Sequence, residues 1–100
     1  MTDQATLDTD ASQGNIFRVT LGGNRTMGAP TNASKGQLII YRIKQDGTGS
    51  RTITWNAIFR FSTDLPSPTL TTTPSKTDYF GFIYNSDDTK WDYIGEVKGF

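Results

Sequence analysis

Short stretches in which apolar and polar residues alternate recur along the chain, and each is followed by turn residues. Between Asn15 and Leu21, the side chains of Phe17, Val19 and Leu21 fall on one side of an extended chain, and Gly22-Gly23-Asn24 follows. A period of two residues predicts β-strands with one face in a core. No window shows a sustained apolar period of 3.6 residues, so the sequence predicts little helix.

The longest pattern of this kind runs from Gln37 to Phe61. Two runs rich in β-branched and aromatic residues flank the five-residue segment Asp46-Gly-Thr-Gly-Ser50, which holds two glycines. This composition predicts an antiparallel hairpin with a longer loop. We expect it to be the central hairpin of the domain, with Ile53 and Trp55 on the buried face of its second arm.

A second hairpin is predicted near the end of the chain. Thr77 to Tyr84 and Lys90 to Val97 both alternate, and Asn85-Ser-Asp-Asp-Thr89 between them is rich in turn residues. Shorter strands are expected within residues 24–28 and 57–61. Strands at intervals of about ten residues predict an all-β fold, an antiparallel two-sheet sandwich or a jelly-roll-like arrangement with little helix.

The two remaining segments are expected to lie outside these strands. Ser62 to Lys76 contains three of the four prolines, and proline cannot donate to a strand ladder, so we expect an extended edge or a loop that crosses between the sheets. Residues 1–13 are mostly polar, with Leu7 as the large apolar residue after Met1. We expect these residues to be a polar N-terminal arm that does not order by itself, and residues 14–100 to be a single β-sandwich domain.

Charge and composition exclude several classes of function. The 100-residue chain holds 10 Lys and Arg against 10 Asp and Glu, so no net charge draws it to nucleic acid or to an anionic membrane. It contains no histidine and no cysteine, which removes histidine-based triads, thiol nucleophiles and zinc sites with nitrogen or sulfur ligands. No signal peptide and no apolar run near 18 residues is present. We expect a non-enzymatic protein with no catalytic, cofactor or metal residues and no contact with nucleic acid or membrane.

Carboxylates are the remaining candidates for chemistry, and turn roles explain them better. The candidates for glycoside cleavage are Asp87 with Asp88, Asp8 with Asp10, and Asp64 or Asp78 meeting across loops. Each lies in turn-like or terminal sequence, where solvated carboxylates are common. Asn85, Asp87 and Asp88 have part of the oxygen spacing of a calcium loop, but they lack its glycine and its distal glutamate.

The aromatic residues offer a different possibility, a flat platform on which a sugar could stack. The residues concerned are Tyr41, Trp55, Tyr79, Tyr84, Trp91 and Tyr93. In a small sandwich without disulfides, alternating tryptophans usually fill the core. We therefore favour core positions for Trp55 and Trp91 and keep the platform as an alternative.

Several motifs are similar to those of a known group of proteins. They are Gly14-Asn15, Pro30-Thr-Asn-Ala33 with Gly36-Gln37, Gln45-Asp-Gly-Thr-Gly-Ser-Arg-Thr-Ile-Thr-Trp55, Phe59-Arg-Phe61, Pro68-Thr-Leu70, Lys76-Thr-Asp78 and the ending from Trp91 to Phe100. With these motifs the run from Asn15 to Phe100 resembles a small domain of tailed-bacteriophage virion proteins, found alone or fused to tail and fibre proteins. The resemblance implies a virion component made in the host cytoplasm.

The resemblance leaves two functions open. A free-standing copy implies a capsid decoration or cement protein on the capsid surface, bound as a homotrimer to the major capsid protein or to another virion protein. The alternative is a carbohydrate- or receptor-binding module of a tail fibre or appendage, with a host glycan as its partner. For the first function, the expected contact residues lie in the arm and in the proline-rich loop: Leu7, Asp8, Pro66, Pro68, Thr71 and Thr72.

Overall fold

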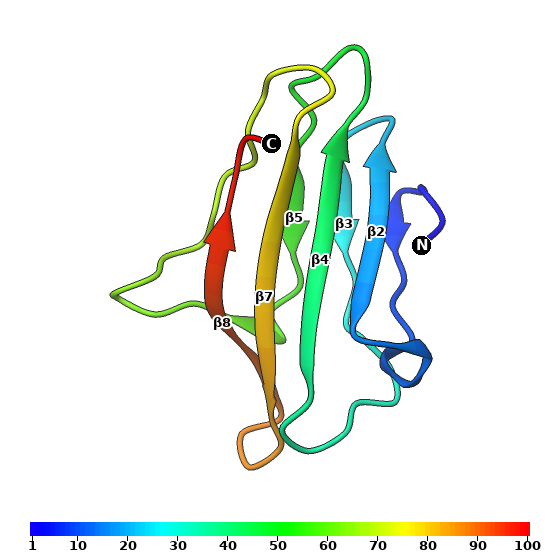
Figure 1. Ribbon diagram of the computed structural model, residues 1–100. Helices are drawn as coiled ribbons and strands as arrows, with labels where there is room; N and C mark the ends of the chain where they lie inside the picture. The colour runs from blue at the N-terminus through cyan, green and yellow to red at the C-terminus, as the bar shows by residue number, and fades with distance from the viewer.

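Two β-sheets pack face to face in the computed structural model, which describes residues 1–100 (Figure 1). The strands are β1 (Thr6–Leu7), β2 (Ile16–Leu21), β3 (Arg25–Met27), β4 (Leu38–Gln45), β5 (Ile53–Trp55), β6 (Phe59–Arg60), β7 (Thr77–Asn85) and β8 (Lys90–Val97), and a 3-10 turn, η1 (Ala11–Gln13), follows β1. One sheet has five strands in the order β2-β4-β7-β8-β6, and the other has three in the order β1-β3-β5. The predicted all-β, two-sheet sandwich is confirmed.

The first half of the chain winds as a coil between the two sheets. β1, β3 and β5 lie in the three-stranded sheet, and β2 and β4 lie in the five-stranded sheet. Each strand therefore returns parallel to the previous strand of its own sheet, as in the pairs β1–β3, β3–β5 and β2–β4. The pairs β4–β7 and β7–β8 are antiparallel. The pair β6–β8 is parallel as well. The prediction of antiparallel sheets is thus wrong for the first half of the fold and for β6. In the first half, a strand in the opposite sheet serves as the crossover that parallel neighbours require.

The predicted central hairpin between Gln37 and Phe61 does not form. β4 pairs with β2 and β7, whereas β5 lies in the other sheet beside β3. The loop between them is organised by Asp46, whose Oδ1 accepts the backbone N–H groups of Thr48 (3.1 Å) and Gly49 (3.0 Å). Gly49 has a φ of 74°, and a Cβ there would lie 2.6 Å from the carbonyl oxygen of Thr72. At this loop the chain therefore passes from the five-stranded sheet to the three-stranded sheet, instead of forming a hairpin between adjacent strands.

The second predicted hairpin is confirmed. β7 and β8 pair antiparallel up to Asn85 and Lys90, with an irregularity in register between Gly81 and Phe82. The side-chain oxygen of Asn85 accepts the backbone N–H groups of Asp87 (3.1 Å) and Asp88 (3.2 Å). This local hydrogen bonding is typical of asparagine in a turn.

The segment between β6 and β7 is a loop, but it does not cross between the sheets. β6 and β7 both belong to the five-stranded sheet, so the expected crossing is wrong. The first part of this loop extends away from the sandwich (Figure 1). Its second part is held at Thr71, whose N–H donates to Asp78 (2.7 Å) and whose carbonyl accepts from the Nε2 of Gln45 (2.8 Å).

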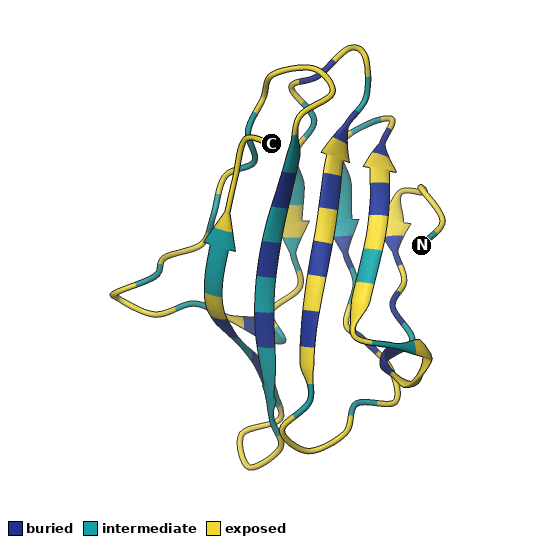
Figure 2. Ribbon diagram, viewed as in Figure 1, coloured by how far each residue is buried: buried dark blue, intermediate teal, exposed yellow.

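Alternating side chains of both sheets fill one core. Figure 2 shows buried positions alternating with exposed ones along β4. The buried apolar residues are Leu7, Ala11, Val19, Leu21, Met27, Ile39, Tyr41, Ile43, Phe59, Phe80, Phe82, Trp91 and Tyr93. Trp91 is fully buried, as predicted, and Trp55 is half-buried against the rings of Phe59 (5.2 Å between centroids) and Phe82 (5.3 Å).

The N-terminal segment is part of the sandwich, so the expectation that it would not order is wrong. Leu7 is fully buried and lies beside Met27 in the β1–β3 register. The backbone supports this position, since the N–H of Gly28 donates to the carbonyl of Leu7 (3.0 Å). The hydroxyl groups of Thr9 and Tyr41 also form a buried hydrogen bond of 2.9 Å. One leucine is sufficient here because two neighbouring strands complete its surroundings.

No helix of the structure is both long and apolar enough to cross a membrane.

Candidate functional site

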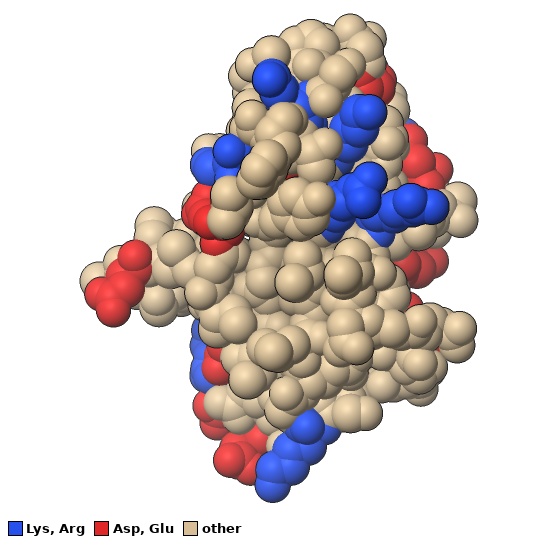
Figure 3. Space-filling model, in the orientation of Figure 1, with Lys and Arg blue, Asp and Glu red and all other residues tan.

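The five-stranded sheet has one face in the core and one face in solvent, which we call the outer face. The period of two along β4 directs Ile39, Tyr41 and Ile43 inward and leaves Leu38 and Ile40 exposed outward. The outer face points toward the viewer in Figure 3, where uncharged atoms cover its centre and a group of basic side chains lies above them. It therefore combines an apolar area with a basic one.

The apolar area contains a groove of about 390 Å³, the outer groove. Its lining residues are Leu38, Ile39, Ile40, Tyr79, Gly81, Ile94, Gly95, Glu96 and Val97. Gly81 and Gly95 face each other in the β7–β8 pair, so no side chains rise from that part of the floor. Leu38, Ile94 and Val97 are each at least half exposed. A contiguous exposed apolar area of this kind is typical of an interaction surface.

An aromatic pair borders the outer groove. The rings of Tyr79 and Phe100 meet edge to face, with centroids 5.6 Å apart and an interplanar angle of 88°. Phe100 is held there by its backbone, which exchanges two hydrogen bonds with Thr77 (2.9 and 3.0 Å). Tyr79 is half-buried, and Phe100 is 64% exposed. Ring surface therefore remains open to solvent at this position.

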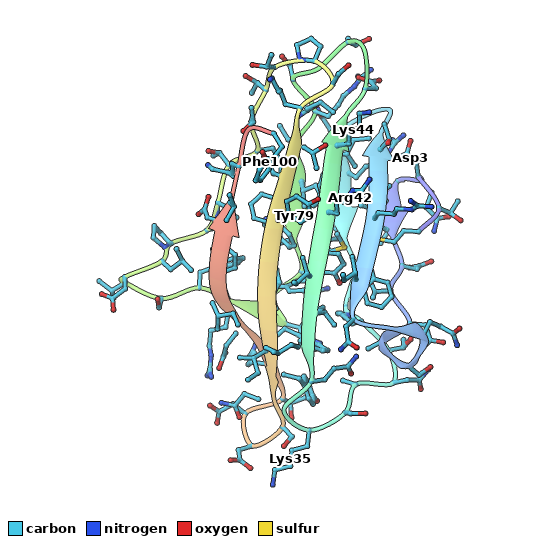
Figure 4. All side chains as sticks on the ribbon, viewed as in Figure 1. Asp3, Lys35, Arg42, Lys44, Tyr79 and Phe100 are labelled. Atoms are coloured by element: carbon cyan, nitrogen blue, oxygen red, sulfur yellow. The ribbon has the colours of Figure 1, made fainter.

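Three exposed cations, Arg18, Arg42 and Lys44, form what we call the basic trio. Arg18 on β2 lies beside Arg42 on β4 in the parallel register, and Lys44 follows two residues later on the same face. Figure 4 shows the labelled side chains of Arg42 and Lys44 on β4, near Tyr79 on β7. Together with Met1, Val19 and Thr20, the basic trio lines a depression of about 310 Å³. The two arginines of the trio come together because the pairing of β2 with β4 places them side by side.

The basic trio has no ion-pair partner, although the other arginines of the chain do. Arg25 pairs with Asp3 (2.8 Å) and Arg51 pairs with Asp46 (2.9 Å). These contacts hold the carboxylates in their charged form: hydrogen bonding from Arg25 lowers the pKa of Asp3, and hydrogen bonding from Arg51 lowers the pKa of Asp46 to about 2. The acidic groups of this region are thus already paired, and the charge of the trio stays uncompensated.

The carboxylates that the sequence analysis considered for catalysis or calcium have structural roles. Asp88 and Asp92 both pair with Arg60, at 3.0 and 2.6 Å, and hydrogen bonding from Arg60 lowers the pKa of Asp92. Asp87 is exposed in the turn that Asn85 caps. No group of three or more acidic side chains is placed to hold a metal ion.

The other carboxylate candidates also bond within the fold. Asp8 accepts from the Nε2 of Gln4 (3.1 Å). Asp10 caps η1 by accepting from the N–H of Ser12 (3.0 Å), and hydrogen bonds from Ser12 and from Asn32 lower its pKa. Asp78 is buried and accepts the N–H groups of Thr71 and Gly99, whereas Asp64 is exposed in the loop before β7.

The six aromatic residues considered as a sugar platform are not brought together on the surface. Tyr41, Trp91 and Tyr93 are buried, and burial raises the pKa of Tyr41. Trp55 packs on core rings, and Tyr84 packs against Trp91 with centroids 4.9 Å apart. Tyr79 is the one that lies on the outer face.

The residues expected to contact a partner lie in two separate regions. Leu7 is buried in the core, so its side chain is not available to a partner, and Asp8 is exposed beside it. In the loop before β7, Pro66 and Thr72 are exposed, and Pro68 and Thr71 are half-buried. A binding role for the exposed members of this set stays a prediction.

Sequence analysis missed the residues that gather on the outer face. Period-two alternation places Arg42 and Lys44 on the outward side of one strand, and this signal is readable from the sequence. The pairing of β2 with β4, which adds Arg18, is not readable, because it depends on a parallel register between distant segments. The groove floor at Gly81 and Gly95 depends in the same way on the β7–β8 register.

Comparison with protein families gives one match, over most of the chain. A family model described as "Putative phage tail fibre C-terminal domain" matches residues 4–89. The curated proteins and the solved structures contain no match. The family match confirms the resemblance to virion proteins of phages, and it supports the tail-fibre alternative better than capsid decoration. The chain therefore belongs to this family of phage tail fibre C-terminal domains and is a structural component of a phage virion.

Proposed function

We propose that this protein is a non-enzymatic, receptor-binding module of a phage tail fibre, and that its outer face binds a glycan of the host surface. The observation that carries the proposal is the aromatic pair of half-buried Tyr79 and exposed Phe100, which lies beside the outer groove and the basic trio. Sugars stack their apolar faces on aromatic rings, while polar side chains nearby fix their hydroxyl groups. The surface is built on paired strands of the five-stranded sheet, and a surface that is preorganised in this way loses less entropy on binding.

A binding role without turnover agrees with the side chains on the outer face. Glycoside cleavage in most enzymes requires two carboxyl groups on either side of the bond. Glu96 is the one carboxylate that lines the outer groove, and it pairs with Lys98 (3.2 Å). We therefore expect the chain to bind a surface polysaccharide without shortening it.

The proposal is tested by measuring adsorption to host cells and to their isolated surface polysaccharide. Tyr79→Ala removes the half-buried ring and should reduce binding by about tenfold or more, because stacking is lost together with its apolar contact area. Thr54→Ala, on the exposed face of the opposite sheet, is the matched control and should bind as the wild type does. Size-exclusion profiles of the polysaccharide before and after incubation show whether any chain is cleaved. Unchanged adsorption of Tyr79→Ala would contradict the proposal.

Self-association is a second candidate for the apolar part of the outer face, since the resemblance to capsid decoration proteins implies a homotrimer. Leu38, Ile94 and Val97 carry no charge and are at least half exposed, which suits burial against a second copy of the chain. A Cβ added at Gly81 meets no atom closer than 3.8 Å, so Gly81→Val should fold and fill the outer groove. Light scattering should then show a shift toward monomers. A monomeric wild type would contradict the predicted trimer.

A further inference from the structure

The basic trio concentrates three unpaired positive charges on one face of a chain whose formal net charge is zero. Arg25, Arg51 and Arg60 are each ion-paired, and the two remaining arginines are neighbours on one face. Adjacent strands lie about 4.8 Å apart, so the guanidinium groups of Arg18 and Arg42 start from neighbouring backbone positions. Like charges placed side by side across strands destabilise a sheet. The fold therefore gains nothing from this arrangement, which favours a ligand as the reason for it.

The surroundings of the basic trio define what such a ligand must look like. Arg42 lies opposite Tyr79 in the β4–β7 register, so a cation and a half-buried aromatic ring on the outer face stand side by side. Thr20 adds a hydroxyl group within the same depression. A ligand that fits has an anionic group for the cations and, next to it, a flat apolar surface for the ring.

We propose that the basic trio binds the anionic group of an acidic sugar, a carboxylate or a phosphate, while the sugar ring contacts Tyr79. This inference rests on the proposed function and names the class of glycan. Arginine suits the role because its planar guanidinium donates two parallel hydrogen bonds to a carboxylate or a phosphate. Lys44 contributes a third charge two residues along β4, at the position paired with Thr20.

Two other occupants fit this part of the face less well. A second copy of the chain that met the same surface would bring the two sets of cations toward each other, and the acidic groups Asp3 and Asp46 are already paired with Arg25 and Arg51. Nucleic acid requires a longer basic track than three side chains provide. The anionic group of one acidic sugar can accept hydrogen bonds from more than one of the three cations that line the depression.

The experiment measures binding of the full chain to three immobilised polymers: polygalacturonate for carboxylate, phosphomannan for phosphate, and dextran as a neutral control. The variants are Arg18→Gln, Arg42→Gln and Lys44→Gln. Lys35→Gln is the charge-matched control, because Lys35 is exposed at the opposite end of the sandwich (Figure 4). The wild type should bind at least one acidic polymer and not dextran.

Each substitution in the basic trio should weaken that binding by about fivefold to tenfold, as expected for an exposed charge-assisted hydrogen bond. Raising the salt concentration from about 50 mM to about 500 mM should weaken it as well, because the screening length shortens severalfold. Lys35→Gln should change the affinity by less than about twofold. The preferred polymer distinguishes carboxylate from phosphate as the bound group.

Three results would overturn the inference. Binding of the wild type to neither acidic polymer is the first, and equal affinity of the trio variants and the wild type is the second. Equally tight binding of duplex DNA at the same charge concentration is the third, since it would make the trio a general polyanion site. If dextran or isolated host polysaccharide is still bound in a Tyr79-dependent manner, the proposed function stands and the acidic-sugar inference alone fails. If the wild type binds none of the polymers and no isolated host polysaccharide, both the proposed function and the acidic-sugar inference fail.

Discussion

Leu7→Ala measures how far the N-terminal segment belongs to the fold. Leu7 is fully buried beside Met27, and β1 is hydrogen-bonded to β3 on both sides of it, through Ala5 with Thr26 and through Leu7 with Gly28. Replacing the leucine side chain by a methyl group removes packed atoms and leaves a cavity between the sheets. For a fully buried leucine this costs about 3 kcal/mol of unfolding free energy. In a domain of this size the melting temperature should fall by about 15 °C.

The assay is denaturant unfolding followed by tryptophan fluorescence, together with thermal melts followed by circular dichroism. Thr6→Ala is the matched control, because Thr6 is exposed in the same strand. Its effect should stay below about 0.5 kcal/mol. If Leu7→Ala unfolds at the same denaturant concentration as Thr6→Ala, then the packing of β1 does not contribute to the stability of the core, and the N-terminal segment is not an integral part of the fold.

Three further predictions concern the aromatic core, the basic trio and the acid stability of the fold. Trp55→Ala should lower the unfolding free energy by about 3 kcal/mol, because its half-buried indole contacts several core rings. Denaturant unfolding followed by circular dichroism measures this free energy, and a change below about 1 kcal/mol would contradict the core role of Trp55. Arg42→Gln should raise the melting temperature by about 1 to 4 °C, because it removes the repulsion between Arg42 and Arg18. A lower melting temperature would contradict the interpretation that the two charges destabilise the sheet. Asp46 has a pKa of about 2 in the folded protein, below its ordinary 3.8, because Arg51 hydrogen-bonds its charged form. Its contribution to stability is therefore complete above about pH 4 and is lost as the pH falls to about 2. Acid-unfolding curves should accordingly be less steep for Asp46→Asn over that range, and identical curves would contradict the assignment.

Strand positions were predictable because alternation is a local signal. The stretch from Asn15 to Leu21 and the hairpin of β7 and β8 carry both the period of two and the turn residues that end it. Strand partners were not predictable in the same way. Asp46 and Gly49 indicate a reversal of the chain equally well whether the next strand joins the same sheet or the opposite one.

The N-terminal segment shows a second limit of local patterns. A single leucine among polar residues predicts a disordered arm, because such a segment cannot bury enough apolar surface by itself. Leu7 becomes part of the core because Met27 and Trp55 lie in register beside it, contributed by strands that are distant in sequence. Burial of this kind is a property of the assembled sheets.

The candidate site lies between these two cases. The outward positions of Arg42 and Lys44 follow from alternation. That they are unpaired depends on which carboxylates pair with the other arginines and with Lys98 in the folded chain. Tyr79 was among the aromatic residues considered from the sequence. Its exposure beside Arg42 depends on the β4–β7 register, which local sequence does not encode.

Amide chemical-shift mapping locates the surface at which the chain binds an acidic glycan, which we place on the outer face of the five-stranded sheet. The isotope-labelled chain would be titrated with oligosaccharides cut from whichever acidic polymer it binds. We predict that the largest shift changes fall on Arg18, Arg42, Lys44 and Tyr79 in strands β2, β4 and β7, and that Arg42→Gln needs about fivefold to tenfold more oligosaccharide to reach the same changes. Shift changes that instead cluster on the exposed face of the three-stranded sheet, or in the loop between β6 and β7, would contradict the account.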